Sequence, residues 1–177
     1  MLRGNSGRDI FLDDGDRQKF LYTLTNKKKN NEFILYAYCL MDNHYHMLIE
    51  LTSENLSLFM RQVNSNYAIY FNKKYNRSGH LWQGRFKSYY VLDEQYLFTL
   101  YRYIEQNPIK AKVAQTIGEY EFTLIATLLN PKLSVIECAE HSQLKTLLKE
   151  EGILEHLELE LTADESEYLK KEQKRKI

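Results

Sequence analysis

Two histidines separated by one residue are the first candidates for chemistry in this sequence. His44 and His46 lie within residues 43–49, a run short enough for one β-strand. Alternate side chains of a strand point to the same face, so both imidazoles would face one way while Tyr45 and Met47 face the other. Neutral imidazole is a good ligand, and adjacent same-face positions can converge on one metal ion. The pattern indicates either a metal site or two surface histidines on a half-exposed strand.

A second candidate group lies further along the chain on one predicted helix. Tyr96, Leu100, Tyr103 and Asn107 recur at spacings of four, three and four, which places them on one stripe. If that helix crosses the histidine face, Tyr103 could be a nucleophile and the amide oxygen of Asn107 a third metal ligand. The alternative is that Tyr103 is a packed core aromatic and that Asn107 caps the helix before Pro108.

The charge distribution indicates a nucleic-acid surface, although the formal net charge of the whole chain is zero. Residues 61–90 contain no Asp or Glu and carry several tyrosines. Basic side chains among aromatic ones suit single-stranded nucleic acid. The alternative is that the aromatics are core residues and the lysines a solvated face. The predicted nucleic-acid-binding residues are Arg61, Lys73, Lys74, Arg77, Trp82, Arg85 and Lys87.

Three helices are expected from capping residues and apolar spacing. The first follows the acidic residues 13–16 and ends before residues 27–31. A long helix capped by Ser53 ends near Asn76, and a third, capped by Asp93, stops at residues 107–108.

Three strands are also expected. Residues 33–40 and 44–51 are rich in β-formers and predict a hairpin, and residues 86–92 predict a third strand. The order helix, strand, strand, helix, strand, helix predicts an α+β fold, with helices packed on a small, largely antiparallel sheet.

Beyond Val113 the signals weaken. The acid-rich remainder predicts one or two amphipathic helices. Their apolar positions are Leu144, Leu147, Leu148 and Leu154. We therefore divide the chain into a catalytic domain, residues 1–118, and an acidic, mainly helical C-terminal extension, residues 119–177.

The chain of 177 residues has room for one ordinary domain and an appendage, with 44% hydrophobic residues. No apolar run is long enough for a membrane span, and no cleavable signal is evident, so we expect a cytoplasmic protein without a membrane partner. Cys39 and Cys138 lack metal-finger spacing and are expected to be small buried hydrophobes.

Three motifs together resemble a known family. Residues 38–48, Tyr-Cys-Leu-Met-Asp-Asn-His-Tyr-His-Met-Leu, look like the HUH signature of single-tyrosine, IS200-like transposases, particularly the REP-associated tyrosine transposase group. Residues 77–86 and 102–111 are similar to later motifs of that group, in the same order. The resemblance runs from about Arg3 to Val113, and three motifs at compatible spacing are far more specific than one.

The resemblance implies a ferredoxin-like (RRM-like) HUH endonuclease fold and a DNA strand-transferase activity. By its motifs His44, His46 and Asn107 would hold Mg²⁺ or Mn²⁺, and Tyr103 would be the nucleophile, with Tyr96 and Tyr101 as rivals. The implied reaction cleaves single-stranded DNA next to a hairpin and leaves a 5′-phosphotyrosine link and a free 3′-hydroxyl. The implied partner is hairpin-bearing single-stranded DNA, bound by a monomer or a homodimer.

One departure from the family pattern opens alternatives. Relatives usually begin with an additional strand before the segment matching Arg3-Gly4-Asn5, whereas here that segment starts the chain. This predicts a sheet whose first strand is missing, as in an inactive or domesticated copy, or else a misassigned start. The alternative function is therefore a non-catalytic single-stranded nucleic-acid-binding protein. A zinc hydrolase is less well supported, because it usually needs three His, Cys or carboxylate ligands.

Overall fold

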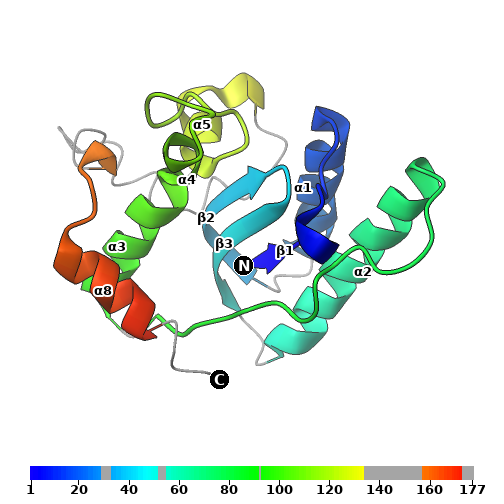
Figure 1. Cartoon of the computed structure of the whole chain (residues 1–177), viewed down its shortest axis with the longest axis horizontal. Coiled ribbons are helices and arrows are strands. Elements are labelled where there is room, and N and C mark those ends of the chain that lie inside the picture. Colours follow the sequence, from blue (N-terminus) through cyan, green and yellow to red (C-terminus); the bar gives the residue numbers. More distant parts are fainter. Residues whose placement is uncertain (29–32, 52–54, 92, 134–156, 173–177) are drawn as a thin grey trace.

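A computed structural model describes residues 1–28, 33–51, 55–91, 93–133 and 157–172 (Figure 1). Its elements are β1 (Leu2–Arg3), the 3-10 turn η1 (Asn5–Gly7), α1 (Asp14–Lys28), β2 (Phe33–Met41), β3 (His44–Leu51), α2 (Leu56–Lys74), α3 (Glu94–Glu105), α4 (Asn107–Lys110), α5 (Leu124–Leu129), η2 (Pro131–Leu133) and α8 (Ala163–Glu172).

The sheet is antiparallel and has the strand order β1-β3-β2. The predicted hairpin is confirmed: Met41 pairs with His44 across a two-residue turn, and Cys39 pairs with His46. Directly opposed residues of an antiparallel pair point to the same face. Cys39 and His46 therefore share one face of the sheet.

The prediction of a third strand at residues 86–92 is wrong for the part that the structure describes. Residues 86–91 form no strand, and residue 92 lies outside the described part of the chain. Lys87 exchanges two backbone hydrogen bonds of 2.9 Å with Met1. A segment rich in β-forming residues becomes a strand only where such bonds continue along it as a ladder. The third strand is instead β1, whose Leu2 and Arg3 pair with Tyr45 and His44. The sheet thus has an edge strand beside the hairpin turn, where we had expected a missing one.

Helices cover both faces of the sheet, which confirms the α+β class (Figure 1). On one face α1 and α2 pack over Tyr45, whose ring lies 4.7 Å from that of Phe20 and whose hydroxyl donates to Asn64 Oδ1 at 2.7 Å. On the other face lies α3, which brings Tyr103 against His46. Because successive residues of β3 point to opposite faces, one strand carries both a core aromatic and the candidate histidines.

The three predicted helices are confirmed, and their first residues show why. Asp93 caps α3 by accepting the Tyr96 N–H at 2.7 Å, as expected. The cap of α2 is Asn55, which accepts the Leu58 N–H at 2.8 Å, while Ser53 lies outside the described residues. At the other end of α3 the chain makes one further helical turn, α4, with proline in its first turn.

The region after residue 118 contributes α5, η2 and α8, and α8 lies beside α3 (Figure 1). The helices expected around Leu144 to Leu154 fall outside the described residues, as does Cys138. Cys39 is buried, as expected for a small apolar side chain. Across the described part of the chain, every helix is too short or too polar to serve as a membrane span.

Candidate metal and nucleophile site

Strand β3 presents the two histidines side by side. The ring centroids of His44 and His46 lie 5.2 Å apart, with the ring planes nearly perpendicular. His46 is buried at 8% exposure and His44 is half-buried. The alternation expected from the sequence is therefore realised, and the histidines line the α3 side of the sheet rather than an open surface.

Both imidazoles are held neutral, the form that can bind a metal ion. Burial lowers the pKa of His46 to about 3, and burial together with the charge of Arg3 lowers the pKa of His44. His44 Nδ1 lies 2.6 Å from Asn43 Oδ1. An amide oxygen only accepts, so Nδ1 carries the proton and Nε2 keeps the lone pair for a ligand. Asn43 was missed as a site residue, although it directly precedes His44 in the motif.

The three tyrosines of helix α3 differ in solvent exposure. Tyr96 and Tyr101 are buried in the core at 1% and 0% exposure, whereas Tyr103 is half-buried. The Tyr103 ring stands edge-on to His46 with centroids 5.5 Å apart. Burial raises the pKa of the Tyr103 phenol, so the hydroxyl is protonated at neutral pH. Among these three residues, only Tyr103 is both accessible and adjacent to the histidines.

The C-cap residue of α3 is Gln106, and the side chain of Asn107, the next residue, bonds to the last turn of α3, close to the capping role of the alternative interpretation. Asn107 Nδ2 donates to the carbonyl oxygens of Tyr103 at 2.6 Å and Ile104 at 3.4 Å. These two bonds tie the Asn107 side chain to the turn that carries Tyr103 and use the amide nitrogen. The other atom of the amide is an oxygen, the type of donor that binds Mg²⁺ or Mn²⁺. An ion at the Asn107 oxygen would therefore leave the capping bonds of the nitrogen intact.

Lys110 joins the site from α4. Its Nζ lies 5.3 Å from the centre of the Tyr103 ring, in the geometry of a cation–π contact. No sequence signal singled it out, because the turn at residues 106–108 had been expected to end the helix. Lys110 follows Tyr103 by seven residues, about two helical turns, and the continuation through α4 keeps both on one side.

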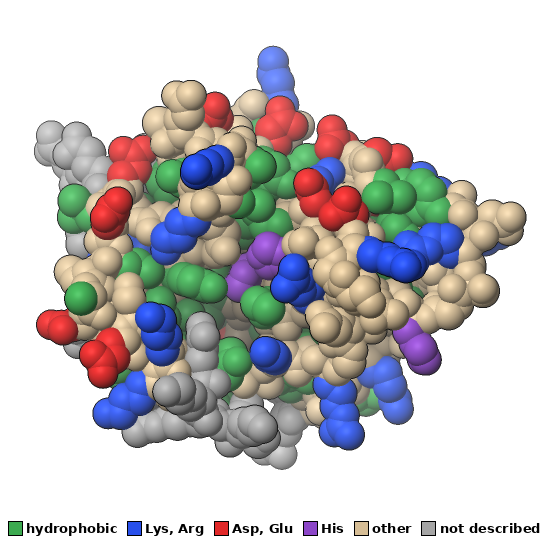
Figure 2. All heavy atoms as spheres, viewed as in Figure 1, with side chains coloured by type: hydrophobic (Ala, Val, Ile, Leu, Met, Phe, Trp, Pro, Cys, Tyr) green, Lys and Arg blue, Asp and Glu red, His purple; other side chains and the backbone are tan. Residues whose placement is uncertain are grey.

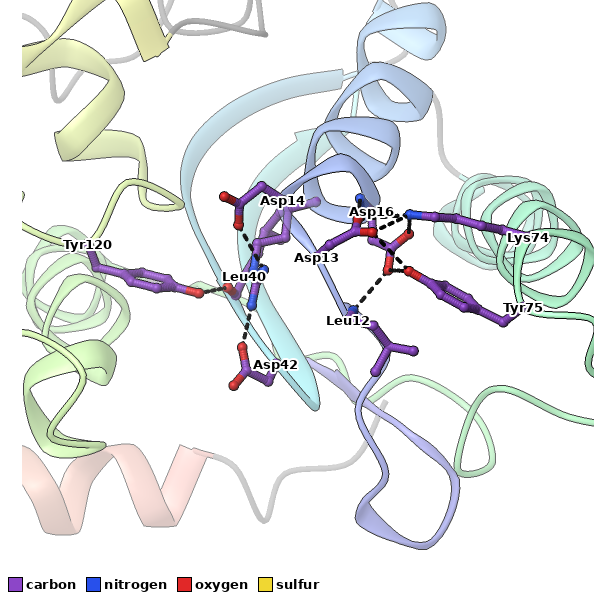
Figure 3. Close-up of polar contacts among 10 residues, drawn as sticks. Leu12, Asp13, Asp14, Asp16, Leu40, Asp42, Lys74, Tyr75 and Tyr120 are labelled. Atoms are coloured by element: carbon purple, nitrogen blue, oxygen red, sulfur yellow. Dashed lines mark hydrogen bonds and ion pairs between the residues drawn. The ribbon is translucent and has the colours of Figure 1, made fainter.

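Side chains from α1 and from the segment before α5 contact the end of β2 and the hairpin turn that leads into His44 (Figure 3). Arg17 of α1 forms ion pairs with Asp42 in the turn and with Asp14. Tyr120 donates its hydroxyl proton to the carbonyl of Leu40 at 2.7 Å. The turn is thus held by α1 on one side and by the segment before α5 on the other.

The N-terminal segment holds the same turn through backbone bonds. Gly4 N–H donates to the Asn43 carbonyl at 2.9 Å, and Ile10 N–H donates to the Asp42 carbonyl at 2.7 Å. A Cβ at Gly4 would lie 2.0 Å from the carbonyl oxygen of Arg8, so only glycine fits there. The glycine of the Arg-Gly-Asn segment is therefore needed for the close packing next to His44.

The predicted nucleic-acid-binding residues fall into two groups. Four are exposed and form no ion pair within the described residues, and they lie on α2 and in the segment after it: Arg61, Lys73, Arg85 and Lys87. The other three have partners within the fold. Lys74 forms ion pairs with Asp13 at 2.7 Å and Asp16 at 2.8 Å (Figure 3). The remaining two, Arg77 and Trp82, pack on aromatic rings.

Figure 2 shows histidine side chains near the middle of one face, with lysine and arginine side chains around them. Over the described residues no cluster of three or more His, Cys, Asp or Glu side chains could hold a metal ion. An ion bound by His44 and His46 would therefore take its other protein donor from a neutral group such as Asn107.

Comparison with known proteins places these observations in context. The sequence model of the family described as "Transposase IS200 like" matches residues 1–107. A solved structure described as "REP associates tyrosine transposase bound to a REP hairpin" superimposes with a TM-score of 0.60 at 15% identity, covering 75% of this chain and 78% of that one. At that identity the likeness shows the fold alone. Among curated proteins the search found no match.

Proposed function

This chain belongs to the IS200-like transposase family, and from that premise we propose that it cleaves and rejoins single-stranded DNA near hairpins with Tyr103 as the nucleophile. The observation that carries the proposal is the approach of the Tyr103 ring to His46, at 5.5 Å between centroids. It joins two motifs that are more than fifty residues apart in the sequence.

The residues present fit a divalent ion. Two neutral imidazoles and one amide oxygen, from His44, His46 and Asn107, make a mixed nitrogen and oxygen set suited to Mg²⁺ or Mn²⁺ rather than to tetrahedral zinc. When bound, such an ion would polarise the scissile phosphate and stabilise the negative charge that develops on the leaving oxygen. Asn43 supports this assignment because it sets the tautomer of His44.

The chemical step assigned to this chain is an in-line displacement at phosphorus. Tyr103 Oη forms a bond to the phosphorus atom while the bond from phosphorus to the 3′-oxygen breaks. The phenol proton passes to solvent, and the 3′-oxygen takes up a proton from solvent. Attack of the freed 3′-hydroxyl on a phosphotyrosine reverses the step, so rejoining needs no external energy source.

Exposed cations would hold the DNA backbone. Arg61, Lys73, Arg85 and Lys87 are solvent-exposed and lie in the acid-free part of the sequence. The similar solved protein is described as bound to a REP hairpin, and we propose a hairpin-bearing single strand as the substrate here as well. A protein that only binds such strands is the alternative, and it would need neither Tyr103 nor the histidines.

We further propose that residues 1–118 form the catalytic unit and that residues 119–177 form an extension attached to it. Gln106, the residue that directly follows α3, supports this arrangement. Its side chain donates to the carbonyls of Leu157 and Leu159 at 2.8 and 2.6 Å, which links the helix of Tyr103 to the C-terminal segment.

The test is covalent adduct formation. Wild-type protein incubated with Mn²⁺ and labelled hairpin-bearing single strands should give a band that survives a denaturing gel. Tyr103→Phe should lose that band and still bind DNA, while Tyr101→Phe and Tyr96→Phe serve as controls on the same helix and should keep it. Excess chelator should abolish the band. DNA binding without an adduct in the wild type would instead support the non-catalytic alternative.

A further inference from the structure

Lys110 is held in place next to the proposed nucleophile by the backbone of α4. Its N–H donates to the Gln106 carbonyl at 3.0 Å, and the Ala111 N–H donates to the Asn107 carbonyl at 3.0 Å. The buried ring of Pro108 anchors the same turn against the fold. The ammonium reaches back over the face of Tyr103, with Nζ 5.3 Å from the ring centre.

Among the described residues, no carboxylate forms an ion pair with the Lys110 ammonium, whereas Lys74 forms ion pairs with Asp13 and Asp16. Burial lowers the pKa of Lys110, and the nearby charge of Arg102 acts in the same direction, while the charge of Glu160 opposes them without forming an ion pair. An ammonium that is partly desolvated next to other positive charge favours an anionic ligand.

We propose that Lys110 binds a non-bridging oxygen of the phosphate that Tyr103 attacks, and that it orients the Tyr103 ring through the same ammonium. This rests on the proposed function. A phosphorus atom in position for attack lies about 3–3.5 Å from Tyr103 Oη, so its oxygens border the ring that Lys110 covers. Lysine acts on phosphate as a mobile point charge and can follow the oxygen as the phosphorus inverts.

Lys110 is exposed like Arg61 and Lys73 of α2, but its role differs from theirs because of its position over the Tyr103 ring. Arg61 and Lys73 can neutralise phosphates anywhere along the strand and set the affinity. Lys110 lies against the reacting side chain, so its charge acts where negative charge grows during the displacement. Removing it should therefore slow the chemical step even when the protein is saturated with DNA.

The experiment compares Lys110→Met, which keeps the aliphatic stem, with Lys110→Arg, which keeps the charge. Lys112→Met, two residues further on and exposed, is the matched control. The first measurement is the single-turnover rate of adduct formation with Mn²⁺ at saturating hairpin DNA. Lys110→Met should be slower by about 100-fold, in the range seen when one charge-stabilising donor is removed. Lys110→Arg should recover much of the rate, and Lys112→Met should match the wild type.

The second measurement, the salt dependence of DNA affinity, does not depend on turnover. Loss of one phosphate contact should reduce the log-log salt slope of Lys110→Met by about 0.7 for a single strand, and Lys110→Arg should retain the wild-type slope. If Lys110→Met forms the Tyr103 adduct at the wild-type rate, the assignment of Lys110 is wrong and the proposed function stands. If the wild type forms no Tyr103-dependent adduct, both are overturned.

Discussion

Arg102 and Glu165 form an ion pair of 2.6 Å that joins α3 to α8 across sixty-three residues of sequence. Arg102 is buried and also donates to the carbonyls of Leu159 and Glu160, at 2.8 and 2.7 Å. The residue directly before Tyr103 therefore holds the C-terminal segment in three places. The helix that carries the proposed nucleophile is braced from the side facing away from the sheet.

We expect Arg102→Met to lower the free energy of unfolding by about 2–3 kcal/mol, because it removes charge-assisted hydrogen bonds and leaves the Glu160 carbonyl without its Arg102 donor, while the Leu159 carbonyl keeps its bond from Gln106. Urea unfolding measures the change. Lys170→Met, on the same helix as Glu165 but exposed, is the control and should have little effect. Equal unfolding midpoints for the two variants would contradict the bracing role.

Gly4→Ala should destabilise the protein, because the added Cβ would lie 2.0 Å from the Arg8 carbonyl oxygen and 2.8 Å from Ile10 Cγ2. The segment must shift, at a cost of about 1–3 kcal/mol as for other overpacked sites. Gly15→Ala is the comparison, since its Cβ would meet only the ends of two flexible side chains, Asp13 Oδ1 at 3.1 Å and Lys74 Nζ at 3.9 Å, and alanine is the better helix former. Thermal unfolding should rank Gly4→Ala well below the wild type and Gly15→Ala near it.

Glu105 makes a specific prediction about pH. Burial raises the pKa of this carboxyl group from 4.5 to about 8, while the Thr123 hydroxyl and the first amides of α5 partly oppose the rise. Between pH 4.5 and 8 the folded protein thus holds a proton that the unfolded chain has lost. Raising the pH through that window lowers the free energy of unfolding, by at most about 1.4 kcal/mol per pH unit.

Glu105→Gln removes this proton and should become more stable relative to the wild type as the pH rises from 5 to 8. The difference between the two unfolding free energies is the quantity to plot, because other titrating groups cancel in it. The exposed Glu121→Gln provides the baseline. A difference that stays flat over these three pH units would show that Glu105 is ionised in the folded protein.

Asn43→Ala should weaken metal binding by about 10–100-fold, as is usual when the hydrogen-bond partner of a ligating histidine is lost. The reason is that Asn43 Oδ1 no longer holds the Nδ1 proton of His44. Titration with Mn²⁺ followed by electron paramagnetic resonance measures the affinity directly. Asn66→Ala, at an exposed position of α2, should bind Mn²⁺ like the wild type; unchanged affinity in Asn43→Ala would exclude His44 as an oriented ligand.

Arg85 and Lys74 should separate DNA binding from folding. Arg85 is exposed, so Arg85→Ala should reduce the log-log salt slope of single-strand affinity by about 0.7 and leave the urea midpoint unchanged. Lys74 is paired with Asp13 and Asp16, so Lys74→Met should lower the urea midpoint and leave the salt slope unchanged. If Lys74→Met instead changed the salt slope and Arg85→Ala changed only the urea midpoint, Lys74 would be assigned to DNA binding and Arg85 would not.

Features set by near neighbours in the chain could be predicted from the sequence. The alternation around His44 and His46 predicted two imidazoles on one face, because side-chain direction on a strand depends only on residue parity. Asp93 predicted the start of α3, because a cap bonds to an amide three residues away. The hairpin was predicted for the same reason, since its two strands join through a two-residue turn.

Contacts between distant segments were decided by the tertiary structure. The sequence placed Tyr96, Tyr101 and Tyr103 on one helix, but only packing against the sheet buried the first two and left Tyr103 beside His46. The third strand came from Leu2–Arg3 rather than residues 86–92, since backbone pairing depends on which edge another segment can reach. Lys74 forms ion pairs with carboxylates about sixty residues away in the sequence. Lys110 contacts Tyr103 because the helix continues through α4, which the sequence did not predict. The partners of a side chain depend on how the whole chain folds around one core, and the local spacing of residues does not specify which distant segments come into contact.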